Sequence, residues 1–140
     1  MTATAAAVAG RLGLARDDWT LCFQSRVGPL EWVRPYIDEE IVRASADHVP
    51  VVVVPVAFVS EHSETLVELD RDYRRRAADT GVPAYERAAT VGTTPAFIAG
   101  LARLVRQSLA LDGTLASGEG FRRCGAGQGH CPMELARSTR

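Results

Sequence analysis

Residues 51–57 read Val-Val-Val-Val-Pro-Val-Ala, a continuous apolar run dominated by β-branched side chains. Such a run is typical of a parallel strand buried on both faces, because helices then cover the sheet from both sides. The flanking segments agree with this reading. Residues 35–46 have helical spacing with acids in the first turn, and residues 63–80 have helical spacing that stops at Gly81. The sequence therefore predicts a helix, a buried strand and a second helix at the centre of the fold.

The alternation of helices and strands continues outward from this centre. Residues 4–14 and 95–111 have helical composition or spacing, and residues 20–27 and 85–89 have strand composition. The apolar side chains of residues 95–111 are expected to face a core. The resulting order favours an α/β fold, an open parallel sheet with flanking helices.

Composition limits the classes of function. With 140 residues, 46% hydrophobic and 24% charged, the chain suits one globular domain, which we expect over residues 1–111 before a Gly-, Arg- and Cys-containing tail over residues 112–140. The 16 basic residues, all arginine, nearly balance 17 acidic ones, which argues against nucleic acid as a partner. No apolar run approaches the roughly 20 residues of a membrane span. The first nine residues lack the basic stretch of a secretory signal, and three cysteines are too few for a disulfide framework. We expect a cytoplasmic protein.

Acidic residues follow the central strand. In open parallel sheets ligands bind beyond the carboxyl ends of the strands, which is where residues 58–72 lie. If a helix begins just before Glu64, then Glu64, Glu68 and Asp72 fall four residues apart on one stripe. Like charges at this spacing cost about 0.2–0.5 kcal/mol per pair, which a bound cation would offset. His62 at the helix entrance adds a nitrogen donor, so the set suits a divalent first-row metal or proton transfer.

A solvated acidic helix face has the same spacing. In that reading His62 is a capping residue and the neighbouring arginines balance the acids. On spacing alone this is the more common explanation of such a stripe.

Two longer motifs resemble one enzyme family. Residues 23–36 read Phe-Gln-Ser-Arg-Val-Gly-Pro-Leu-Glu-Trp-Val-Arg-Pro-Tyr, and residues 54–66 read Val-Pro-Val-Ala-Phe-Val-Ser-Glu-His-Ser-Glu-Thr-Leu, with Asp-Arg-Asp-Tyr at 70–73. Both are similar to ferrochelatase segments, in the same order. The resemblance implies two Rossmann-like domains around a porphyrin cleft, with this chain as the C-terminal domain. It also implies a lyase of haem biosynthesis that inserts ferrous iron into a porphyrin and releases two protons.

The resemblance also implies roles for individual residues. Glu64 matches a carboxylate proposed as acid/base or metal ligand, and His62 matches its hydrogen-bonding neighbour, so both are expected to be catalytic. Glu68 and Asp72 match an acidic line that conducts the metal toward the macrocycle. Glu61 stands where many relatives have aspartate, which keeps the charge and leaves its contacts open.

Three further residues are expected to bind the porphyrin. Trp32 and Phe58 match aromatics near the macrocycle, and Trp32 is the better candidate for a cleft wall because prolines and a glycine place it in a loop. Arg26 could meet a propionate carboxylate, although a salt bridge within the fold would use it equally well.

One departure from the family concerns histidine. The family's first domain supplies a further histidine for metal binding or proton abstraction, and neither His48 nor His130 occupies its place. We expect this chain to be a fragment or an alternative start that is inactive alone. Its expected partners are porphyrin, ferrous iron and the N-terminal half of the same enzyme, with peripheral membrane contact as a further candidate.

The tail contains a cysteine pair. Residues 124–132 read Cys-Gly-Ala-Gly-Gln-Gly-His-Cys-Pro and resemble the tail with which some bacterial ferrochelatases bind a two-iron two-sulfur cluster. Such clusters normally take four thiolates, and Cys124 and Cys131 supply two. The alternative is a tail with two free thiols. Cys22, in a predicted strand, is expected to be a core residue.

Two other classes of function stay open. The chain could be a non-catalytic α/β module that binds a tetrapyrrole or a divalent cation. It could also be a cobalt or nickel chelatase of related architecture, although the motif at residues 23–36 argues against that branch. The sequence does not distinguish protoporphyrin from coproporphyrin as the substrate.

Overall fold

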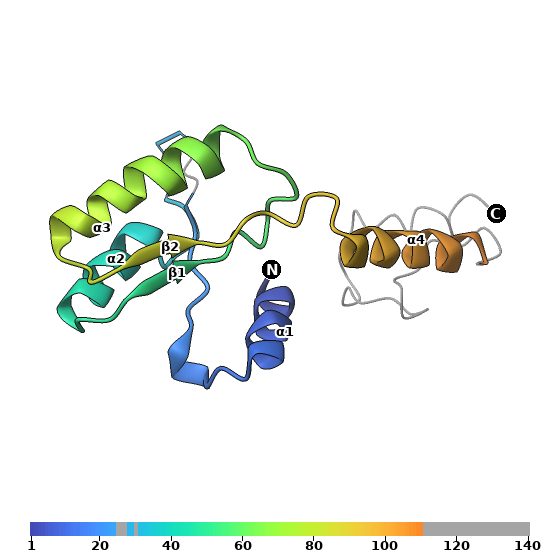
Figure 1. The fold of residues 1–140 in the computed structure, drawn as a ribbon, viewed down its shortest axis with the longest axis horizontal. Coiled ribbons are helices and arrows are strands. Elements are labelled where there is room, and N and C mark those ends of the chain that lie inside the picture. Colours follow the sequence, from blue (N-terminus) through green and yellow to red (C-terminus); the bar gives the residue numbers. More distant parts are fainter. Residues whose placement is uncertain (25–27, 30, 111–140) are drawn as a thin grey trace. The chain divides into compact units, whose positions relative to one another are not determined.

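The computed structural model of the chain describes residues 1–24, 28–29 and 31–110 (Figure 1). The chain divides into one unit over Met1–Gly92 and a second that begins at Thr93. In the second unit the described residues form helix α4, Pro95–Leu109. The expected domain boundary between residues 111 and 112 stays a prediction.

The first unit carries a small parallel sheet. Strands β1 (Val51–Val53) and β2 (Tyr85–Arg87) pair in parallel, with Val51 opposite Tyr85 and Val53 opposite Arg87. The other described elements of the unit are α1 (Thr2–Leu12), the 3-10 turn η1 (Arg16–Asp18), α2 (Ile37–Ala46), the π-helix η2 (Glu64–Tyr73) and α3 (Arg74–Thr80). In Figure 1 η2 and α3 form one continuous helix beside α2 and the two strands. The predicted α/β class and the parallel pairing are confirmed.

Local signals place the helix ends close to where they were expected. Gly13 ends α1 and Gly81 ends α3, each with a positive φ that glycine adopts without steric cost. At the start of α2 the backbone N–H of Tyr36 donates to the Glu39 carboxylate at 2.9 Å, which satisfies one of the orphan donors of the first turn. The predicted helices at residues 4–14, 35–46, 63–80 and 95–111 all form, with ends shifted by up to two residues.

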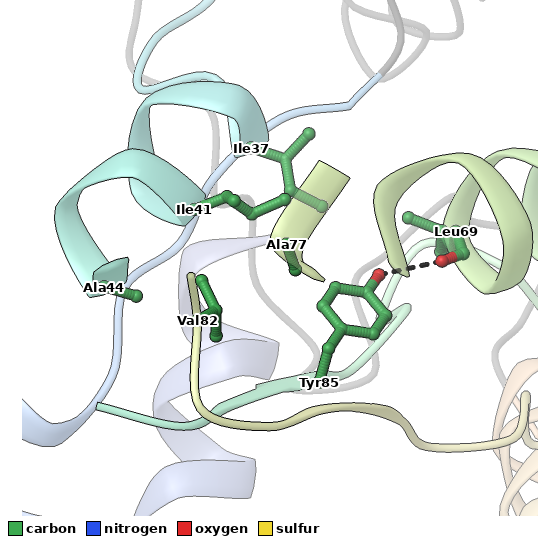
Figure 2. Close-up of a cluster of buried hydrophobic side chains, with 7 residues drawn as sticks. All are labelled: Ile37, Ile41, Ala44, Leu69, Ala77, Val82 and Tyr85. Atoms are coloured by element: carbon green, nitrogen blue, oxygen red, sulfur yellow. Dashed lines mark hydrogen bonds between the residues drawn. The ribbon is translucent and has the colours of Figure 1, made fainter. Parts of the chain in front are cut away.

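The core lies between α2, the continuous helix and β2 (Figure 2). Its buried side chains form one cluster, namely Ile37, Ile41, Ala44, Leu69, Ala77, Val82 and Tyr85. Ile41 is 1% exposed and Ala77 is fully buried, so α2 and α3 approach closely there. Cys22 is half-buried and packs against this cluster, so it borders the core and is not one of its buried residues. Its burial, with Glu40 nearby, raises the pKa of the thiol to about 11.

Two strand predictions are corrected. Of the strand expected at residues 20–27, the described residues 20–24 form a single parallel bridge, between Phe23 and Tyr36. The strand expected over residues 51–57 ends at Val53, two residues before Pro55, which has no N–H to donate to a ladder. The prediction that this strand is buried on both faces is also wrong, because Val52 is 68% exposed. Val51 and Val53 point to the opposite face and pack against the core cluster.

The expectation for the last helix is wrong as well. Helix α4 buries none of its described residues, and its large apolar side chains Ile98, Leu101, Leu104, Val105 and Leu109 are exposed. Apolar spacing shows which face of a helix suits burial, but it does not show that a partner surface is present.

Ten residues of the helix predicted at 63–80, Glu64–Tyr73, are π-helical. A π-helix closes i→i+5 hydrogen bonds, and where it gives way to an α-helix one carbonyl near the junction loses its N–H partner. Two side chains donate to carbonyls at this point. The Tyr85 hydroxyl donates to the Leu69 carbonyl at 2.9 Å, and Arg74 Nε donates to the Asp70 carbonyl at 3.2 Å. Arg74 donates from four residues along the same helix, whereas Tyr85 donates from β2. The support from Tyr85 is therefore tertiary, and local propensity does not encode it.

Within the described ranges of the chain, none of the helices combines the length and the apolar character that a membrane crossing requires.

The Tyr85→Phe variant tests the support of this junction. Removing the hydroxyl leaves the buried Leu69 carbonyl without this donor, so the free energy of unfolding should fall by about 1 kcal/mol. Urea denaturation followed by far-UV circular dichroism measures this. An unchanged free energy of unfolding in Tyr85→Phe would contradict the assignment.

Candidate active site

The loop that leaves β1 carries the first candidate pair. The rings of Phe58 and His62 lie edge to face, with centroids 4.5 Å apart and an interplanar angle of 82°. Both side chains are half-buried. Edge-to-face contact sets the orientation of a ring as well as burying it, so Phe58 fixes the plane of the imidazole.

Hydrogen bonds fix His62 further. The backbone N–H of His62 donates to Thr65 Oγ1 at 2.9 Å, and the Thr65 hydroxyl donates to the His62 carbonyl at 3.0 Å. Thr65 is fully buried, so this pairing is shielded from water. The backbone N–H of Glu64 donates to His62 Nδ1 at 3.2 Å. A ring nitrogen that accepts a hydrogen bond carries no proton, so the neutral imidazole has its proton on Nε2.

The predicted carboxylates all lie on the π-helix. Glu64, Glu68 and Asp72 are half-buried, and the wide π-helical turn keeps residues four apart on neighbouring turns. Gln24 Nε2 donates to Glu68 Oε2 at 2.5 Å, which links the first sequence motif to the second across 44 residues. Arg71 Nε donates to Asp72 Oδ1 at 2.9 Å. Sequence reasoning missed Gln24, although it stands inside the motif at residues 23–36.

These carboxylates do not form a closed metal shell. In the part of the chain that the structure describes, no three or more His, Cys, Asp or Glu side chains lie close enough together to hold a metal ion. Separate carboxylates along a helix offer a cation successive weak contacts instead. The metal contacts of Glu64, Glu68 and Asp72 stay a prediction.

Glu61 has a structural partner in β2. Arg87 Nη1 lies 2.8 Å and 3.0 Å from the two Glu61 carboxylate oxygens, and the Thr90 N–H donates to Glu61 Oε1 at 2.9 Å. The hydrogen bonds from Arg87 are the main reason that the pKa of Glu61 falls from 4.5 to about 2. Both carboxylate oxygens of Glu61, which is one methylene longer than aspartate, therefore accept hydrogen bonds. With its lowered pKa, Glu61 remains ionised at neutral pH.

The same guanidinium binds Asp70. Arg87 Nε donates to Asp70 Oδ1 at 2.7 Å and Nη2 donates to Oδ2 at 2.5 Å, a bidentate pair that lowers the pKa of Asp70. The Arg87 side chain is 8% exposed. Sequence analysis missed Arg87. The available signal was an arginine inside a short strand candidate, where a charge needs a partner.

Trp32 lies in a loop, as its flanking residues predict. Its side chain is exposed. The Tyr36 hydroxyl accepts a hydrogen bond from the backbone N–H of Trp32 and donates one to the Trp32 carbonyl, both at 3.2 Å. The loop is thus tied to the start of α2. Arg26, Cys124 and Cys131 lie outside the described residues, so their expected roles stay predictions.

Comparison with known proteins gives one family. The profile of the Ferrochelatase family matches residues 1–109. The chain is 50% identical over 138 residues to a ferrochelatase of Caulobacter vibrioides, which covers 98% of this chain and 39% of that protein. It is 42% identical over 133 residues to a ferrochelatase of Hyphomonas neptunium, covering 94% and 36%. A Synechococcus ferrochelatase is 50% identical over 99 residues, covering 69% and 26%. The chain therefore spans about two fifths or less of the length of these relatives.

Acid titration tests the pairing of Glu61. Because the folded-state pKa is lowered, the ion pair should contribute its full stability above pH 4.5 and lose it as the pH falls toward 2. The 13C chemical shift of the Glu61 carboxyl, followed by NMR across this range, should give a midpoint near 2. A midpoint at the ordinary glutamate value of 4.5 would show that Arg87 does not hold the charged form.

Proposed function

This chain belongs to the ferrochelatase family, and from that premise we propose that it is part of an enzyme that inserts ferrous iron into a porphyrin in haem biosynthesis. The observation that carries the proposal is the arrangement of His62 and Glu64 at the entrance of the π-helix, within the matched region. The substrate class follows from the family.

Proton transfer is proposed to be divided between these two residues. Each of the two pyrrole N–H groups must lose its proton as the metal enters, so the site needs a proton acceptor. Because His62 Nδ1 accepts from the Glu64 N–H, the neutral ring presents an N–H donor at Nε2. The accepting role falls to the Glu64 carboxylate, and His62 is suited to donate a hydrogen bond that orients a carboxylate or a substrate nitrogen.

The remaining acids are proposed to deliver the metal. Glu68 and Asp72 continue from Glu64 at intervals of four residues on the π-helix. Carboxylate oxygens bind ferrous iron and release it again more readily than thiolates do. The hydrogen bond from Gln24 to Glu68 Oε2 holds that carboxylate in place.

Aromatic side chains are proposed to contact the porphyrin. Phe58 packs on His62, so a macrocycle placed against the site would meet both rings. Trp32 presents an exposed indole from its loop, and Arg26 would pair with a propionate carboxylate.

The activity is proposed to require polypeptide beyond this chain. The chain spans 39% of the Caulobacter relative. The motif resemblance implies a cleft to which a second domain contributes a further histidine. The purified 140-residue chain is therefore expected to be inactive alone. A cytoplasmic location, and peripheral contact with a membrane for porphyrin or haem transfer, belong to the same proposal.

The thiols of this chain do not by themselves fit an iron–sulfur cluster. Such a cluster takes four thiolates, whereas the chain has three cysteines. Cys22 is half-buried against the core, and burial that raises its pKa to about 11 keeps the thiol protonated. Cys124 and Cys131 remain, and no step of the mechanism is assigned to them.

A complementation assay tests the proposed function. The chain is mixed with a separately produced N-terminal segment of the Caulobacter relative, and anaerobic insertion of ferrous iron into a soluble porphyrin is followed by absorbance. Activity should appear in the mixture and be absent from either part. Glu64→Gln removes the proposed proton acceptor with little change in shape, so it should lower kcat by about 100-fold or more.

Glu86→Gln is the matched control. It makes the same substitution at an exposed position of β2, with a 73% exposed side chain, and should leave kcat unchanged. Porphyrin binding without insertion, in a mixture shown to form a folded complex, would favour the non-catalytic binding module instead.

A further inference from the structure

Arg87 occupies a position from which it reaches both ends of the candidate site. Arg87 stands two residues after Tyr85 in β2, so both side chains lie on the same face of the strand. Both donate hydrogen bonds to the π-helix, so this face meets that helix. The guanidinium is 8% exposed, and Nε, Nη1 and Nη2 all donate to carboxylates. Nη1 also donates to the Ala88 carbonyl at 3.2 Å.

The two carboxylates that Arg87 binds lie on either side of the candidate site residues in the sequence. Glu61 immediately precedes His62, and Asp70 follows Glu68 by two positions. One rigid, planar group therefore fixes the chain on either side of the segment that carries His62, Glu64 and Glu68.

The segment between the two anchors needs such support. A π-helix is rare because its i→i+5 hydrogen bonds compete with an α-helix of the same residues, and it persists where tertiary contacts favour it. An α-helical turn would change the direction in which Glu64 and Glu68 point relative to each other. Anchors at positions 61 and 70 fix both the entrance and the winding of the helix.

We propose that Arg87 is a positioning residue that holds His62, Glu64 and Glu68 in the π-helical arrangement by binding Glu61 and Asp70 simultaneously. The catalytic part of this inference rests on the proposed function, whereas the structural part concerns this chain by itself. Arginine suits the role because its donors lie in a fixed fork, and lysine offers a single point charge that cannot satisfy both carboxylates in this geometry.

Amide hydrogen exchange of the 140-residue chain tests the structural part. In Arg87→Met the amides of η2 should exchange roughly 10- to 100-fold faster, since charge-assisted hydrogen bonds are lost at both ends. The amides of α2 should keep their protection, because Arg87 does not contribute to the core cluster. Arg87→Lys keeps the positive charge but lacks the planar set of donors. It should also speed exchange in η2, which would show that the donor geometry is needed in addition to the charge.

Arg76→Met is the matched control. Arg76 Nε pairs with Asp38 at 2.9 Å, with a 48% exposed side chain, and it lies in α3 outside the bracketed segment. It should leave exchange in η2 unchanged. If Arg87→Met does not fold, Glu61→Gln and Asp70→Asn remove one anchor at a time. Each should loosen the end of the segment nearest to it.

Kinetics of the reconstituted mixture test the catalytic part. Arg87→Met should lower kcat roughly 10- to 100-fold and leave KM for the porphyrin unchanged, as expected for a residue that orients reacting groups without touching substrate. Equal loss of protection in α2 and η2, or unchanged protection in η2, would overturn the positioning role. If protection in η2 falls as expected while the wild-type mixture makes no metalloporphyrin, the positioning role stands and the proposed function fails.

Discussion

Hydrogen bonds from one face of β2 to the π-helix are the constraint on which the rest of the first unit depends. Tyr85 donates to the Leu69 carbonyl near the π-to-α junction, and Arg87 binds Asp70 and Glu61. The same Tyr85 ring belongs to the buried cluster, and this burial raises the pKa of its hydroxyl to about 12. A phenol that stays neutral remains a donor, so the contact that supports the junction is also part of the core.

This constraint explains how a short loop can hold a precise site. The chain between β1 and the π-helix has no regular structure at Phe58 and His62, yet both of its ends are fixed. β1 pairs with β2 on one side, and Glu61 is bound by Arg87 of the same strand on the other. The buried Thr65 then satisfies the backbone of His62, so the imidazole is oriented by neighbours that are themselves held.

The charges of the site separate into two groups with different tasks. Glu61 and Asp70 have lowered pKa values because Arg87 donates to both, which makes them permanent anions with a structural role. Glu64, Glu68 and Asp72 lie along the π-helix and do not belong to that pair. A single arginine thus holds two acids in structural ion pairs, and in our proposal it positions the segment that carries the other three.

The sequence by itself determined the helix positions, the glycine stops, the parallel α/β pattern and the family, because these depend on spacing and on motifs read along the chain. A continuous apolar run suggested burial for Val52, and apolar spacing suggested it for α4, but the described structure shows exposure at both. Tertiary structure decided the winding of the helix at residues 64–73 and the partners of Glu61 and Asp70. The donors responsible, Tyr85 and Arg87, stand 16 and 17 residues beyond the groups that they bind on that helix. Local periodicity cannot show which distant side chain will satisfy a carbonyl or a carboxylate, since that depends on how the elements pack.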